Sequence, residues 1–176
     1  MINLYKALIQ PYLNYGIQIW GNSKPTHLQK VIRIQKKAIR TIHGASYNSH
    51  TAPLFKNALI LEISDLYEFQ VLIFMRDYKT NNLPQSFSNL FLQNLDINTS
   101  HRTRQSELYY VPKCKNKFAW NLPYSIYPRV WNKWNNHIDI STSKPGFLNS
   151  IKNHMLEKYQ SLIKCKYRNC RDCRKK

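Results

Sequence analysis

The groups in this sequence that could support metal-catalysed phosphoryl transfer are its nine carboxylates. Polymerases and nucleases use two or three carboxylates to hold metal ions about 4 Å apart. None of the nine acids are adjacent, and none follows a strand-like apolar run. Their one cluster, Glu62, Asp65 and Glu68, lies at the start of a predicted helix, where the helix dipole favours negative charge. We therefore predict no catalytic residue in this chain.

Nucleophilic catalysis and phosphate loops also lack support. The sequence has four glycines and contains neither a Gly-x-Ser-x-Gly elbow nor a Gly-rich phosphate loop. Its six histidines are scattered without the spacing of metal ligands. Surface or capping roles are the simpler interpretation for them.

The last cysteines of the sequence have a partial metal-binding pattern. Cys165, Cys170 and Cys173 are spaced C-x4-C-x2-C, and the second half matches zinc knuckles. A structural zinc site needs four ligands, so His154 or Cys114 would have to complete it. The alternative is a basic tail with reduced thiols, which we favour. We expect no cofactor, with zinc as the weaker alternative, and no disulfide framework, which suits a reducing intracellular setting.

The strongest indication of a binding site is in the segment from Thr26 to Gly44, where one face of a predicted helix carries only positive charges. At 100° per residue its five basic side chains fall within an arc of about 120°, opposite an apolar arc. Neighbouring charges rise by about 4.5 to 6 Å, comparable to the phosphate spacing of one nucleic-acid strand. A solvated face is the alternative, but it does not explain why no Asp or Glu occurs from Met1 to Leu61. The five residues are Lys30, Arg33, Lys36, Lys37 and Arg40.

That face requires a helix, and the sequence has signals for both of its ends. Thr26 followed by Gln29 fits a capping box, and Gly44 is a typical C-terminal stop. The side of the helix that faces the core is predicted from the helical spacing of its apolar residues. Its members are Leu28, Val31, Ile32, Gln35, Ala38, Ile39 and Ile42.

Other elements are expected on both sides of this helix. Pro11 should kink or restart an N-terminal helix, and a buried helix is predicted over 65–79 with Ser64 as N-cap. The aromatic segment 108–134 predicts one or two short strands, then a brief helix near 129–134. Its aromatic side chains could stack on bases, but a small core is the favoured interpretation. They are Tyr109, Tyr110, Phe118, Trp120, Tyr124, Tyr127, Trp131 and Trp134.

Net charge favours an anionic partner. The 176 residues include 27 Lys and Arg against nine Asp and Glu, a formal charge of +18. A charge of this size favours nucleic acid first and a membrane surface second. No run reaches the roughly 18 apolar residues of a membrane span, and the N-terminus lacks the features of a signal peptide. We expect an intracellular protein, nuclear or cytoplasmic, that binds RNA or DNA and no membrane.

Several phrases, read in order, resemble the region downstream of the catalytic core in non-LTR retrotransposon reverse transcriptases of the LINE type, jockey-like ones in particular. The first two are "LYKALIQPYLNYGIQIWGNS" and the basic helix "LQKVIRIQKKAIRTIHGASYNSHTAPLF". The later ones are "TRQSELYYVPKCKNK" and "RVWNKW". The similarity extends over roughly residues 3 to 159.

The resemblance implies a thumb-like piece of an RNA-directed DNA polymerase. The paired catalytic aspartates of that family would lie upstream of Met1, so the chain is expected to hold template or primer without being an enzyme by itself. Arg102 and Arg104 are expected to assist the five helical cations. The alternative is a protein–protein interaction remnant that packs on upstream polymerase domains.

We therefore predict a mainly α fold, with an N-terminal helical bundle and a smaller α+β C-terminal segment. The expected regions are a thumb-like region 1–95, a linker 96–107, a small α+β region 108–163 and a basic, cysteine-containing tail 164–176.

Overall fold

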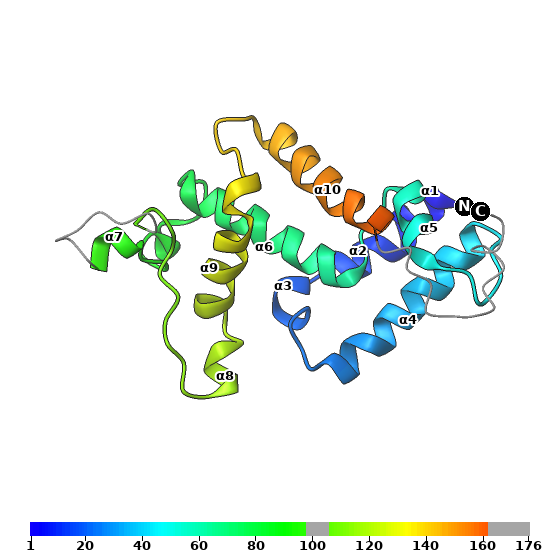
Figure 1. Ribbon diagram of the computed structural model, residues 1–176, viewed down its shortest axis with the longest axis horizontal. Coiled ribbons are helices and arrows are strands. Elements are labelled where there is room, and N and C mark those ends of the chain that lie inside the picture. Colours follow the sequence, from blue (N-terminus) through cyan, green and yellow to red (C-terminus); the bar gives the residue numbers. More distant parts are fainter. Residues whose placement is uncertain (98–105, 162–176) are drawn as a thin grey trace. The chain divides into compact units, whose positions relative to one another are not determined.

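The computed structural model describes residues 1–97 and 106–161, and within these ranges the chain is helical (Figure 1). No strand occurs there; one antiparallel bridge pairs Gln93 with Tyr109. The predicted mainly α class is confirmed. The elements are α1 (Ile2–Leu4), η1 (Tyr5–Ile9), α2 (Gln10–Asn14), α3 (Ile17–Trp20), α4 (Pro25–Ile42), α5 (Thr51–Ala58), α6 (Ile63–Lys79), η2 (Gln85–Phe87), α7 (Asn94–Ile97), α8 (Lys117–Trp120), α9 (Pro123–Trp134), η3 (Asn135–His137) and α10 (Lys144–Ser161).

The helices form two compact units, which are described separately. The described part of unit 1 comprises 1–67 and 149–161, and unit 2 comprises 68–148. Helices α6 and α10 therefore supply residues to both units. The linker predicted at 96–107 lies mostly on residues outside the described ranges, so that boundary stays a prediction.

Unit 1 opens with a continuous helix that passes through a proline. Pro11 has no N–H to donate, and its ring would collide with the carbonyl four residues back in a regular α-helix. Five residues before α2, Tyr5–Ile9, adopt the wider π-helical turn, a known way to absorb such a defect. The helix continues to Asn14, and the chain then turns through Gly16, whose φ is 61°.

Helix α4 starts at a different residue than predicted, but it ends where it was predicted to end. It begins at Pro25, which suits the first helical position because its φ is fixed and its missing N–H is not needed. Lys24 is therefore the N-cap, and the capping-box interpretation of Thr26 is wrong. At the other end Gly44 has a φ of 58°. Ala45 N–H donates to the Arg40 carbonyl at 2.9 Å, which closes a Schellman motif.

The last helix is fastened to the rest of unit 1 by Tyr159. Its buried phenol accepts the Glu62 N–H at 2.9 Å and donates to the Asp65 carboxylate. Burial, followed by the neighbouring carboxylate of Asp65, raises the pKa of Tyr159. The ring also packs 6.2 Å from that of Phe55, so α5, α6 and α10 share one core.

Unit 2 is built around the two sequence phrases "LYY" and "VWNKW". The rings of Tyr109 and Trp131 lie 6.4 Å apart. The Asn132 side chain accepts the Tyr109 N–H at 3.0 Å and donates to the Tyr109 carbonyl at 2.7 Å. Trp134 Nε1 donates to the Glu68 carboxylate at 3.0 Å. The two phrases are therefore in direct contact within unit 2.

The strands expected in the C-terminal region are not seen in the described part of 108–163. Asn132 bonds both polar groups of the Tyr109 backbone, a role that a neighbouring strand would otherwise have. The helix expected near 129–134 is longer than predicted: α9 begins at Pro123 and contains Pro128. Pro123 suits the start of this helix, because its φ is fixed and its missing N–H is not needed there.

Buried tyrosines make the folded state sensitive to alkali. Burial, then the neighbouring Tyr78, raise the pKa of Tyr109 to about 12. An unfolded tyrosine ionises near pH 10, so the unfolded state loses its proton first. This group contributes on the order of 2 kcal/mol to the free energy of unfolding. The contribution is fully present below about pH 10 and is lost as the pH rises through about 12. Urea unfolding at pH 9 to 12 should show this decline. It should be shallower in Tyr109→Phe and unchanged in Tyr110→Phe, whose ring is exposed.

Candidate nucleic-acid interface

Helix α4 is held in place by one buried polar side chain, Gln35. Its amide nitrogen donates to the Tyr5 hydroxyl and to the Leu61 carbonyl, both at 3.0 Å. Its amide oxygen accepts the Ile63 N–H at 3.1 Å. Gln35 therefore links η1, α4 and the start of α6 within unit 1. Burial raises the pKa of Tyr5, and the hydrogen bond from Gln35 opposes that rise.

The opposite side of α4 carries three exposed cations. Lys30, Arg33 and Lys37 are exposed, and they form no hydrogen bond or ion pair through their side chains with the described residues. Their positions i, i+3 and i+7 place them in one row, rising by about 4.5 and 6 Å along the helix. They are the most accessible part of the predicted face.

The other two predicted cations have partners inside the fold. Lys36 Nζ lies 2.9 Å from the Glu62 carboxylate, and both side chains are about a quarter to a third exposed. Arg40 Nε donates to the Ser49 carbonyl at 3.0 Å, and its guanidinium lies over the Tyr47 ring at 5.9 Å. Helical periodicity cannot reveal such partners, because both come from other segments.

The remaining predicted site residues lie outside the described ranges. These are Arg102, Arg104, Cys165, Cys170 and Cys173. Cys114, a possible fourth zinc ligand, is described as a free thiol whose sulfur is 3.8 Å from Ser125 Oγ. Zinc binding therefore stays a prediction.

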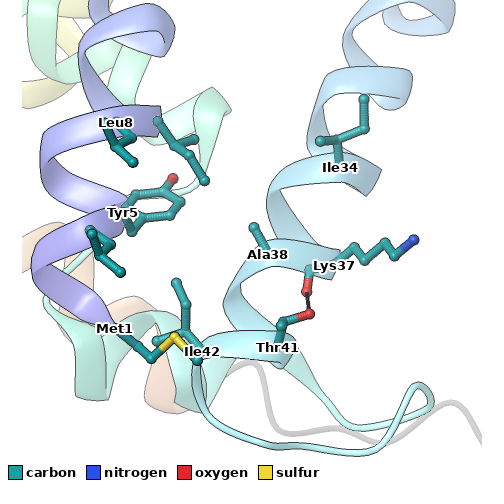
Figure 2. A pocket seen from close by; sticks show the side chains of 10 residues that line it. Met1, Tyr5, Leu8, Ile34, Lys37, Ala38, Thr41 and Ile42 are labelled. Carbon is teal, nitrogen blue, oxygen red and sulfur yellow. Dashed lines mark hydrogen bonds between the residues drawn. The ribbon is translucent and has the colours of Figure 1, made fainter.

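An apolar groove that the sequence did not indicate adjoins the cationic row. It has a volume of about 380 Å³ and lies between the N-terminal helix and α4 (Figure 2). Ile34 is 68% exposed at its wall, and Lys37 lies at its edge with its ammonium group directed away from the opposite helix. The lining residues are Met1, Leu4, Tyr5, Leu8, Ile9, Ile34, Lys37, Ala38, Thr41 and Ile42.

The acids around α6 are engaged in contacts that stabilise the fold. Besides the pairs of Glu62 and Asp65 already described, Glu68 accepts from Lys133 at 2.7 Å and Asp77 from Lys144 at 2.7 Å. Within 1–97 and 106–161, no three His, Cys, Asp or Glu side chains come together as a possible metal-binding group. Among the same residues, no helix has the length and apolar character needed to cross a bilayer.

Comparison with known proteins relates the chain to the RNA-directed DNA polymerases of mobile genetic elements. No protein-family model and no solved structure matches it. One relative is the RNA-directed DNA polymerase from the mobile element jockey of Drosophila melanogaster, which is 27% identical over 103 residues. Another is the polymerase from jockey of Drosophila funebris, which is 33% identical over 64 residues. A probable RNA-directed DNA polymerase from transposon X-element of Drosophila melanogaster is 28% identical over 64 residues.

These matches cover 58% of this chain for the first relative and 36% for the other two. The chain spans only 11%, 7% and 7% of the length of those relatives. The resemblance to non-LTR, LINE-type elements is confirmed, and the partial coverage fits a fragment of a reverse transcriptase.

Proposed function

We propose that this chain binds the sugar-phosphate backbone of RNA, DNA or their hybrid through the cationic face of α4. The observation that carries the proposal is the row of Lys30, Arg33 and Lys37, exposed and without partners among the described residues. It lies in a stretch of sequence, residues 1 to 61, that contains no acid. Phosphate contacts by Lys and Arg provide affinity without reading sequence.

Lys36 and Arg40 are proposed to join the interface when a phosphate approaches. A partly exposed ion pair such as Lys36–Glu62 is worth only about 0 to 1 kcal/mol, so a phosphate can compete with the carboxylate. Arg40 uses Nε for Ser49, which leaves its terminal nitrogens available for a second acceptor. The interface then contains three to five cations.

The relatives suggest the setting for this binding. They are named as RNA-directed DNA polymerases, so the proposed partner is the template or primer of such an enzyme. We propose that the chain corresponds to the thumb-like part, that Arg102 and Arg104 add to the binding surface, and that it acts in the nucleus or cytoplasm.

Direct titration with labelled oligonucleotides tests the proposal. In dilute buffer the chain is expected to bind RNA, DNA and hybrid saturably, with affinities that differ little between unrelated sequences of the same length. Binding that depends strongly on sequence, or no binding at all, would contradict it.

We also propose that the chain does not polymerise by itself. Four of its nine acids are engaged in the structural contacts of Glu62, Asp65, Glu68 and Asp77. A primer-extension assay with Mg²⁺ or Mn²⁺ is expected to give no product. Template-dependent extension that persists through purification would establish an enzyme.

The apolar groove favours a second function, packing against a neighbouring domain of a larger polymerase. Large exposed apolar surfaces commonly mark protein interfaces, and the groove exposes Leu4, Leu8 and Ile34. This function predicts self-association of the isolated chain, reduced in Leu8→Gln, together with weak, non-saturating nucleic-acid binding. A concentration-independent monomer that binds oligonucleotides saturably would exclude it as the main function.

A further inference from the structure

The aromatic residues of segment 108–134 separate into a core set and a surface set. Tyr109, Tyr127, Trp131 and Trp134 are buried, as the sequence led us to expect. The other four expose between 38% and 75% of their surface: Tyr110, Phe118, Trp120 and Tyr124. Four large aromatic residues are thus exposed within a stretch of 15 residues.

Phe118 and Trp120 belong to α8 and Tyr124 to the first turn of α9, which follows it (Figure 1). Tyr110 lies elsewhere, because its N–H donates to the Leu92 carbonyl at 2.9 Å beside the bridge between Gln93 and Tyr109. The Asn116 side chain accepts the Ala119 N–H at 2.7 Å and starts α8. Cys114 contacts Ser125 of α9, so the preceding loop runs beside that helix. The contact between Trp120 and Arg129 also brings α8 against α9.

Trp120 has one face occupied by a cation. The Arg129 guanidinium lies 3.7 Å from the centre of its ring, and Arg129 is itself held by the Ser125 carbonyl at 3.1 Å. Trp120 is nevertheless 41% exposed as a residue, which leaves room for another flat group beside it. A fixed indole backed by a guanidinium is well suited to stacking on a base.

Charge selects the class of partner. No Asp or Glu occurs between Leu108 and Ile138, whereas Lys113, Lys115 and Lys117 alternate along the loop into α8. All three lysines are exposed and form no ion pair within the described ranges. Rings for bases and lysines for phosphates, with no opposing acid, match the requirements of single-stranded nucleic acid.

We propose that this surface of unit 2 binds unpaired nucleotides by stacking on Trp120, with the three lysines contacting phosphates. It goes beyond the backbone binding proposed for α4, because it discriminates between single strands and duplexes. It uses residues of the other unit, so either proposal can fail alone.

Fluorescence titration of the full chain with a thymidine homopolymer of about 15 nucleotides tests the inference. Stacking should quench tryptophan emission, and the quench should be lost in Trp120→Phe, which keeps a ring but not the indole. Trp120→Ala should weaken single-strand binding by about fivefold or more, and blunt-duplex binding by less than twofold. Phe118→Ala, which removes a ring that is 75% exposed from the same helical turn, should not have this effect.

Tyr12→Ala, which removes an exposed ring from unit 1, is the matched control and should leave both affinities unchanged. Equal losses on single strand and duplex in Trp120→Ala would overturn the inference, as would wild-type single-strand affinity in that variant. If the α4 proposal is wrong and this one is right, neutralising α4 changes little while Trp120→Ala still loses single-strand binding.

Discussion

Replacing Gln35 with leucine is expected to lower the free energy of unfolding by about 2 to 4 kcal/mol. The substitution keeps the volume close to that of glutamine but removes all three hydrogen bonds to Tyr5, Leu61 and Ile63. The partner groups stay buried, and each buried polar group left without a partner costs about 1 to 3 kcal/mol. The loss is measurable as a shift of the urea midpoint with an unchanged slope.

Gln29→Leu is the matched control for that experiment. It makes the same chemical change on the same helix, but Gln29 is exposed. Substitutions on the surface usually change stability by less than about 0.5 kcal/mol. If the two variants were equally stable, Gln35 would not be the residue that holds α4 against the core.

The combined variant Lys30→Gln, Arg33→Gln and Lys37→Gln is expected to have the largest effect on binding. Each neutralised phosphate contributes about 0.9 to the salt slope on duplex DNA. When salt is raised from 50 to 200 mM, the wild type should therefore lose roughly 40-fold more affinity than the variant, which lacks three contacts. Stability should change little, because none of the three side chains is bonded to the described fold.

A second variant distinguishes the face of α4 from net charge alone. Lys79→Gln removes one exposed charge near the end of α6, outside the proposed interface. It is compared with Lys37→Gln, which removes one charge from the row. Equal effects of these two single changes would mean that only the total charge matters.

Local signals in the sequence predict most of α4. Its end could be placed because Gly44 permits the left-handed conformation that a Schellman motif needs. Its buried side could be predicted from the helical spacing of the apolar residues, and Gln35 and Ile39 are the most buried residues on that side. Its N-cap was misplaced by two residues, at Thr26 and not Lys24, because Pro25 has the better geometry for the first turn.

Contacts between distant segments could not be predicted in this way. The partners of Lys36 and Arg40, at Glu62 and Ser49, depend on how other segments return to α4. The prediction of strands in 108–134 was wrong for a similar reason. The Tyr109 backbone is bonded by Asn132, a helical residue 23 positions further along the chain. Sequence could suggest a cationic face, but only the structure shows which of its charges are unoccupied.

The central claim, that α4 presents its cations to a polyanion, is tested most directly by the salt dependence of oligonucleotide affinity. With three to five phosphate contacts, a plot of log affinity against log salt should have a slope of about −2 to −3.5 on single strands and about −3 to −4.5 on duplex DNA. The combined α4 variant should flatten both slopes. A wild-type slope near zero, or one that the variant leaves unchanged, would show that this face does not contact phosphates.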